Sequence, residues 1–185
     1  GSIYSRLKQH KSAIEEYNKA IKHAEDEEEI LTNIAFEYEN GGQYKEAITY
    51  LKRVLELNPE NEAAMFELSF CFEIAREVEN GIEWLTGFLN TNPYNKIAWF
   101  VLGIAYNTKE LYEKAIEAYE FVIAIDPKYA SAYFNLGNAY ANMQQYKKAI
   151  KNYRETFVHE DAQALTHYYI GECYEKLNRN KEAID

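Results

Sequence analysis

Apolar and aromatic residues recur along this chain with a helical spacing. Within residues 96–129, Trp99, Leu102, Gly103 and Tyr106 follow the spacing i, i+3, i+4 and i+7. That spacing places the four positions on one face of an α-helix. A second stripe of the same kind follows a short polar gap and consists of Ala115, Ile116, Tyr119 and Ile123. The pattern therefore predicts two consecutive helices, each with one buried face.

The same two stripes return every 34 residues. The segment 98–106 has counterparts in the same frame, which are 30–38, 64–72, 132–140 and 166–174. A Tyr-x-x-Ala-Ile pattern opens the second stripe at 44–48, 112–116 and 146–150. An Asn-Pro or Asp-Pro pair closes three of the units, at 58–59, 92–93 and 126–127. Because proline disfavours a helical conformation in the residue before it, each second helix is predicted to end at that pair.

This pattern resembles the tetratricopeptide repeat (TPR). The family motif has a large residue at position 4, Leu-Gly at 7 and 8, Tyr at 11, Gly at 15, Tyr at 17, Ala at 20, an aromatic at 24, Ala at 27 and Pro at 32. The resemblance covers the whole chain. It implies an all-α fold, an α-α superhelix, in which antiparallel hairpins of roughly 13 residues per helix stack into a right-handed solenoid.

The repeat register treats residues 1–185 as a single TPR array. It contains a partial repeat at 1–27, full repeats at 28–61, 62–95, 96–129 and 130–163, and a partial repeat at 164–185. Both ends are expected to be cut inside a repeat, so the sequence reads as a piece of a longer array. Since terminal repeats normally carry a polar cap, truncated ends are expected to allow end-to-end self-association.

Two repeats depart from the motif. Repeat 62–95 has Val78 at position 17 and two glycines, Gly81 and Gly87, in its second helix. A helical glycine costs about 1 kcal/mol relative to alanine, so this helix is expected to be the softest. Repeat 130–163 has Asp161 in place of the closing proline, which leaves its end less defined by the sequence.

No catalytic motif appears in the chain. It contains no GxGxxG, Walker, GxSxG or HExxH sequence, and its many glutamates follow the exposed positions of helices. Cys71 and Cys173 occupy the same repeat position, 102 residues apart, and are expected to be small packing residues. The sequence therefore predicts a protein that is not an enzyme, with no cofactor and no metal site.

Charge narrows the class of partner. The formal net charge is −10 and the sequence pI is about 5.0, so nucleic acid and anionic membrane surfaces are disfavoured partners. No apolar run approaches the roughly 20 residues that span a bilayer, so no membrane insertion is expected. A cytoplasmic location is predicted, although Gly1-Ser2 resembles a cloning scar and a native targeting segment can be absent. The repeats, rich in Asn, Lys and Tyr, are typical of bacterial proteins.

The resemblance also implies a binding surface. In family members that bind peptides, the first helix of each repeat lines a concave groove, and positions 2, 5, 6, 9, 12 and 13 face the ligand. The corresponding candidate peptide-binding residues here are Thr32, Asn33, Phe36, Glu39, Asn40, Phe66, Glu67, Phe70, Glu73, Phe100, Val101, Ile104, Phe134, Asn135, Asn138 and Tyr168. Aromatic residues at position 5 belong partly to the scaffold. The apolar residues at position 9, which is often polar, are more informative, and packing and ligand contact are both open for them.

The candidate groove is acidic. Family members that hold acidic C-terminal tails need Lys at position 5, and no repeat of this chain supplies it. Residues 28–95 carry four Lys or Arg against thirteen Asp or Glu, a net charge of −9. We therefore predict a protein-interaction scaffold that binds a protein or peptide segment, extended or helical, with apolar anchors and basic flanks.

Two other functions fit the same sequence. The chain could be a regulatory or substrate-docking arm of a larger enzyme, in which case the flanking sequence would encode a catalytic domain. It could also be a structural array that stacks with copies of itself, which concentration-dependent sedimentation would reveal.

Overall fold

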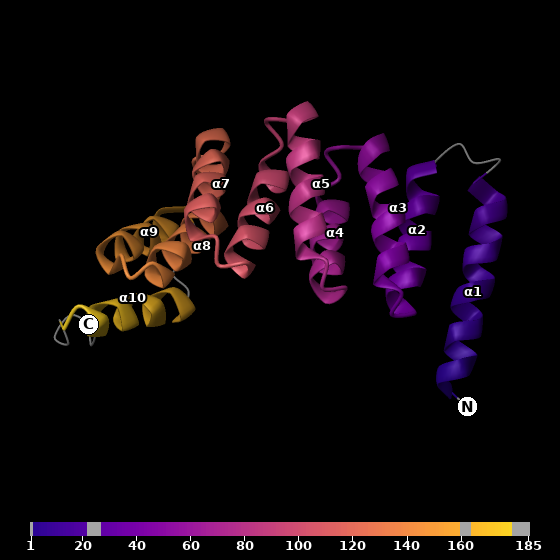
Figure 1. The fold of residues 1–185 in the computed structure, drawn as a ribbon, viewed down its shortest axis with the longest axis horizontal. Coiled ribbons are helices and arrows are strands. Elements are labelled where there is room, and N and C mark those ends of the chain that lie inside the picture. Colours follow the sequence, from indigo (N-terminus) through magenta and orange to yellow (C-terminus); the bar gives the residue numbers. More distant parts are fainter. Residues whose placement is uncertain (1, 22–26, 160–163, 179–185) are drawn as a thin grey trace. The chain divides into compact units, whose positions relative to one another are not determined.

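The chain folds into α-helices throughout the part that the structure describes. The computed structural model describes residues 2–21, 27–159 and 164–178, which contain ten α-helices and no strand (Figure 1). The predicted all-α fold is therefore confirmed. The chain divides into two compact units, residues 1–95 and 96–185. The division falls where one 34-residue repeat ends and the next begins in the sequence.

Each unit is a row of antiparallel helices. Unit 1 contains α1 (Ser2–Ala20), α2 (Glu27–Asn40), α3 (Tyr44–Leu57), α4 (Glu62–Ile74) and α5 (Val78–Thr91). Unit 2 contains α6 (Lys96–Thr108), α7 (Tyr112–Ile125), α8 (Ala130–Asn142), α9 (Tyr146–His159) and α10 (Ala164–Lys176). In unit 1, α3 packs against both α2 and α4, and in unit 2, α7 packs against α6 and α8 (Figure 1). From α2 onward each helix has 13 or 14 residues, as the repeat spacing predicts.

The second helix of each of the first three full repeats ends as predicted. Helices α3, α5 and α7 end at Leu57, Thr91 and Ile125, each one residue before an Asn-Pro or Asp-Pro pair. The N–H of Asn58 still donates to the Val54 carbonyl at 2.8 Å, which closes the last turn before the proline. The less certain end of the fourth full repeat lies partly outside the described residues, since α9 ends at His159 and residues 160–163 are not described.

The first helix of every repeat from α2 onward ends in one left-handed residue at position 15. These residues are Gly42 (φ 73°), Arg76 (φ 59°), Glu110 (φ 58°), Gln144 (φ 60°) and Asn178 (φ 54°). In the first full repeat the next N–H, that of Gln43, donates back to the Tyr38 carbonyl at 2.8 Å, and the three following repeats make the same bond. Only this repeat has the expected glycine. The turn keeps its shape in the others, at a cost of about 1–2 kcal/mol for a left-handed non-glycine residue.

A glycine under a tyrosine ring joins the two helices of each full repeat in unit 2. A Cβ atom on Gly103 would lie 2.5 Å from Cε1 of Tyr119, and one on Gly137 would lie 2.6 Å from Cδ1 of Tyr153. Both tyrosines are fully buried, and Ala115 beside the first of them is buried as well. Position 8 is thus glycine in both repeats where the aromatic ring from position 24 crosses it, which agrees with the expectation that small residues let these helices approach.

The hydroxyls of these two tyrosines differ in their partners. The Tyr153 hydroxyl donates to Oδ1 of Asn138 at 2.8 Å. The Tyr119 hydroxyl is buried and has no hydrogen-bond partner within the described part of the chain. The sequence explains the difference, since position 9 is Asn138 in one repeat and Ile104 in the other. An unpaired buried hydroxyl is destabilising, so the repeat with Ile104 contains a polar group that its own side chains do not satisfy.

The two glycines of α5 have different surroundings. A Cβ atom on Gly81 would lie 3.0 Å from the Phe72 ring, so this glycine makes room for an aromatic side chain of α4. Nothing lies within 4 Å of a Cβ on Gly87, which faces open space. Gly81 therefore has a packing role and Gly87 has none, while the expected softness of α5 stays a prediction.

The glycine under the ring can be tested by adding one methyl group. We expect Gly103→Ala to destabilise the protein by about 1–3 kcal/mol, because the new Cβ overlaps the Tyr119 ring. Gly87→Ala is the matched control, and we expect it to stabilise by up to about 1 kcal/mol through helix propensity alone. Thermal unfolding followed by far-UV circular dichroism gives both midpoints. A Gly103→Ala midpoint at or above that of Gly87→Ala would contradict the packing described.

The two buried hydroxyls can be tested by removing each. We expect Tyr153→Phe to cost about 0.5–1.5 kcal/mol, because it breaks the bond to Asn138 and leaves that carbonyl unpaired. Tyr119→Phe removes a hydroxyl without a partner, and we expect it to leave stability unchanged or to raise it. Urea unfolding of the two variants provides the comparison. Equal losses in both variants would show that Tyr119 has a hydrogen-bond partner in solution.

Candidate functional site

Large apolar side chains are exposed on the first helices of unit 1. Phe36 on α2 is 59% exposed, and Phe66, Phe70 and Ile74 on α4 are 39%, 46% and 47% exposed. They occupy positions 9, 5, 9 and 13 of their repeats, which lie on the helix side away from the core. We call these four residues the phenylalanine face. Exposed apolar groups gathered on one surface of a soluble protein commonly mark an interaction site.

Acidic side chains flank the phenylalanine face. Glu39 of α2 interacts with Glu67 of α4, so the two carboxylates lie close together where the helices meet. Burial raises the pKa of Glu39, and the negative charge of Glu67 raises it further, while a hydrogen bond with the Cys71 thiol opposes the shift. Burial and the Glu39 charge raise the pKa of the Cys71 thiol to about 12, so this group stays neutral. Glu73 on the same helix is exposed.

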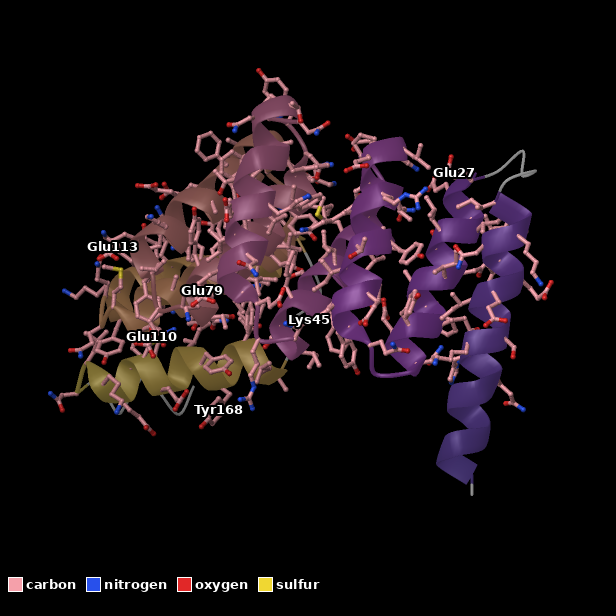
Figure 2. All side chains as sticks on the ribbon, turned by 45° about the vertical axis from the view of Figure 1, so that its right-hand side comes forward. Glu27, Lys45, Glu79, Glu110, Glu113 and Tyr168 are labelled. Atoms are coloured by element: carbon pink, nitrogen blue, oxygen red, sulfur yellow. The ribbon has the colours of Figure 1, made fainter. Side chains whose placement is uncertain are left out.

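The basic residues of this region have partners elsewhere. Lys45, labelled in Figure 2, pairs with Glu77 at 2.5 Å. Arg53 pairs with Glu27 at 2.8 Å, and the Lys52 ammonium lies over the Phe72 ring at 5.2 Å from its centroid. Among the described residues, no Lys or Arg forms an ion pair with the glutamates that flank the phenylalanine face. The negative charge predicted for this part of the groove is thus uncompensated there.

The remaining predicted residues of unit 1 have mixed environments. The Thr32 hydroxyl donates to the Glu28 carbonyl of its own helix at 2.9 Å. Asn33 is half-buried, and Asn40 and Glu67 are exposed. Phe70 is held by Tyr44 of α3, whose ring meets it edge-to-face with centroids 6.1 Å apart. This contact orients Phe70 while leaving much of its ring exposed.

The predicted residues of unit 2 range from buried to exposed. Phe100 is 6% exposed and packs on Tyr119 and Tyr129, and Val101 is fully buried. Phe100 and Val101 are therefore part of the scaffold. The others vary: Phe134, Asn135, Asn138 and Ile104 are half-buried, and Tyr168 on α10 is 61% exposed (Figure 2).

Described residues of unit 2 line at least two cavities. The smaller, of about 220 Å³, brings together the predicted Phe100, Phe134 and Asn135 beside Ser131 and Leu165. The larger, of about 400 Å³, is lined by Asn107, Asn138, Ala141, Asn142, Tyr146, Tyr153, Tyr169, Glu172, Cys173 and Lys176. Asn138 is one of the candidate residues, and six more of these residues occupy the ligand-facing positions 6, 9, 12 and 13 of their repeats: Asn107, Ala141, Asn142, Tyr169, Glu172 and Lys176. Tyr146 and Tyr153 were missed because they belong to a second helix, although the glycine opposite Tyr153 signals that its ring crosses toward the first-helix side.

The described residues show no feature of a metal centre or a membrane span. No three or more His, Cys, Asp or Glu side chains in this part of the chain are grouped to hold a metal ion. None of the described helices is both long enough and apolar enough to cross a bilayer.

Solved structures with the same fold include several proteins of known name. A "Crystal structure of MamA" is 28% identical, with a TM-score of 0.69, and the match covers 82% of this chain and 88% of that one. "MamA 41-end from Desulfovibrio magneticus RS-1" is 21% identical, with a TM-score of 0.70 and coverage of 86% and 90%. TTC0263, titled a thermophilic TPR protein in Thermus thermophilus, is 21% identical, with a TM-score of 0.62 and coverage of 85% and 86%. The last two similarities show the fold alone.

Family comparisons assign the repeats directly. No curated protein matches the sequence. Residues 1–26, 28–61 and 134–185 match families described as "Tetratricopeptide repeat", and residues 103–144 match one described as "TPR repeat". These matches spread over most of the chain and agree with its helix hairpins. The chain belongs to the tetratricopeptide-repeat family.

Proposed function

We propose that this protein is a scaffold that binds a protein segment with apolar anchors and basic flanks on the phenylalanine face of unit 1. The repeat family and the MamA-like neighbours support the coarser statement, a protein-interaction scaffold. The finer statement rests mainly on one observation, the exposure of Phe36, Phe66, Phe70 and Ile74 on α2 and α4. The protein would then act by binding and not by catalysis.

Burial of apolar side chains supplies the favourable free energy of binding. Fully burying a phenylalanine side chain contributes about 1.5–3 kcal/mol relative to leaving it exposed. Phe36 and Phe70 each keep roughly half of their surface in water, so a partner that covers them recovers part of that free energy. Since Tyr44 already restricts the Phe70 ring, little side-chain entropy is lost when a ligand packs on it.

Charge supports a basic partner. Glu39 and Glu67 lie side by side, and Glu73 is exposed one turn beyond Phe70. A Lys or Arg side chain placed near the first two would relieve their mutual repulsion and would favour the charged form of Glu39. Such complementarity chiefly increases the rate of association and the selection of partners.

Two substitutions on the phenylalanine face test the placement. The probe is a capped amphipathic peptide with phenylalanine or leucine at i, i+4 and i+7 and lysine flanks, titrated by calorimetry. We expect Phe70→Ala to weaken binding about tenfold or more, because an anchor at an interface centre is lost. We expect Glu73→Lys to weaken peptide binding more at low salt than at high salt. Unchanged affinity in both variants would rule out this surface.

Matched controls separate the surface from general effects. Phe121→Ala removes a phenylalanine that is also about half exposed but lies on α7, and it should leave the affinity unchanged. Replacing the lysine flanks of the peptide with glutamate should abolish binding. Because the pKa of Glu39 is raised, this carboxylate becomes neutral as the pH falls toward that pKa, so affinity should decrease with it. Glu39→Gln should remove that part of the pH dependence.

A further inference from the structure

The larger of these two cavities in unit 2 is lined mainly by amide and aromatic side chains. Three asparagines, Asn107, Asn138 and Asn142, come from α6 and α8. Rings of three tyrosines, at positions 146, 153 and 169, close the remaining sides. The cavity also has one carboxylate, Glu172, and one ammonium group, Lys176. Its lining therefore carries no net charge at neutral pH and offers mainly amide groups and aromatic surface.

One hydrogen bond holds the Asn138 carboxamide. The Tyr153 hydroxyl donates to its Oδ1 at 2.8 Å. Burial raises the pKa of Tyr153, so this hydroxyl keeps the proton that it donates. The Nδ2 end of Asn138 has no acceptor among the described residues. Asn138 thus presents an N–H donor that a ligand carbonyl can accept.

Asn107 supplies the complementary group. Its Oδ1 atom is buried and has no hydrogen-bond partner within the described residues. Asn107 lines the cavity, so a side-chain rotation that turns this oxygen toward the cavity lets a ligand N–H pair with it. The cavity therefore suits a ligand group with both an N–H donor and a carbonyl acceptor. A carboxylate lacks the donor and an ammonium group lacks the acceptor.

We propose that this cavity binds the carboxamide side chain of a glutamine or asparagine residue in a protein partner. The inference rests on the proposed scaffold function and adds a second recognition site with different chemistry. A primary carboxamide offers its donor and acceptor from one end, so it can satisfy two groups inside one cavity. A trans peptide unit points its C=O and N–H in opposite directions, so a single unit cannot present both groups to the cavity from one end. The volume of about 400 Å³ lies in the range of small-ligand pockets.

Capped tripeptides provide the test. Acetyl-Ala-Gln-Ala-amide is titrated into the ¹⁵N-labelled full chain and followed by NMR, with a dissociation constant on the order of 1 mM expected for so small a ligand. Acetyl-Ala-Glu-Ala-amide and acetyl-Ala-Lys-Ala-amide should bind at least about tenfold more weakly, because each leaves a cavity amide unpaired. Acetyl-Ala-Ala-Ala-amide reports on main-chain recognition. Equal binding of this peptide, tighter binding of the glutamate peptide, or no binding of any peptide would overturn the proposal.

Paired asparagine variants locate the site. Asn107→Leu should weaken the glutamine peptide about tenfold, whereas Asn152→Leu should not, because the Asn152 amide donates to the Lys148 carbonyl and lies outside this cavity. Circular dichroism confirms that both variants are folded. Phe70→Ala should leave tripeptide binding intact. If the lysine-flanked peptide does not bind while the glutamine tripeptide does, the proposed function is refuted. If the glutamine tripeptide does not bind while the lysine-flanked peptide does, the carboxamide site is refuted.

Discussion

The position of one aromatic ring in each repeat determines how its two helices pack and which surface they expose. Where the ring comes from position 24, it crosses the first helix over a glycine, as Tyr119 crosses Gly103 and Tyr153 crosses Gly137. The ring then fills the core, and the hydroxyl of Tyr153 reaches the side where Asn138 lies. A Cβ atom beneath the ring would overlap it, so the ring and the glycine pack as a pair.

Unit 1 places its aromatic residues differently. Position 24 in its full repeats holds Leu51 and Leu85, which are buried, and position 9 holds Phe36 and Phe70, which are exposed. In unit 2, position 24 holds tyrosine and position 9 of the full repeats holds Ile104 or Asn138. At these two positions, aromatic rings are therefore buried in unit 2 and exposed in unit 1. This exchange explains how one repeat fold can present an apolar, acidic face in unit 1 and an amide-lined cavity in unit 2.

The sequence was sufficient for the fold and only partly sufficient for the surfaces. The 34-residue period and the helical stripes predicted the helix hairpins, and the Asn-Pro and Asp-Pro pairs predicted where α3, α5 and α7 end. The left-handed turn at position 15 could be expected at Gly42 but not at Arg76 or Glu110, where the surrounding structure imposes it. Phe66 and Phe100 both occupy position 5 of their repeats, yet Phe66 is exposed and Phe100 is buried. The burial of each ring depends on the neighbours that pack against it. The large cavity needed side chains from four helices, which no single stripe reveals.

The most direct test of the proposed binding surface is the location of the bound segment on unit 1. The ¹⁵N-labelled chain, with assigned backbone amides, is titrated with the lysine-flanked amphipathic peptide, and chemical-shift changes are mapped onto the helices. We predict changes concentrated on α2 and α4, around Phe36, Phe70 and Glu73. Changes concentrated on α3 and α5, with α2 and α4 unaffected, would contradict the placement.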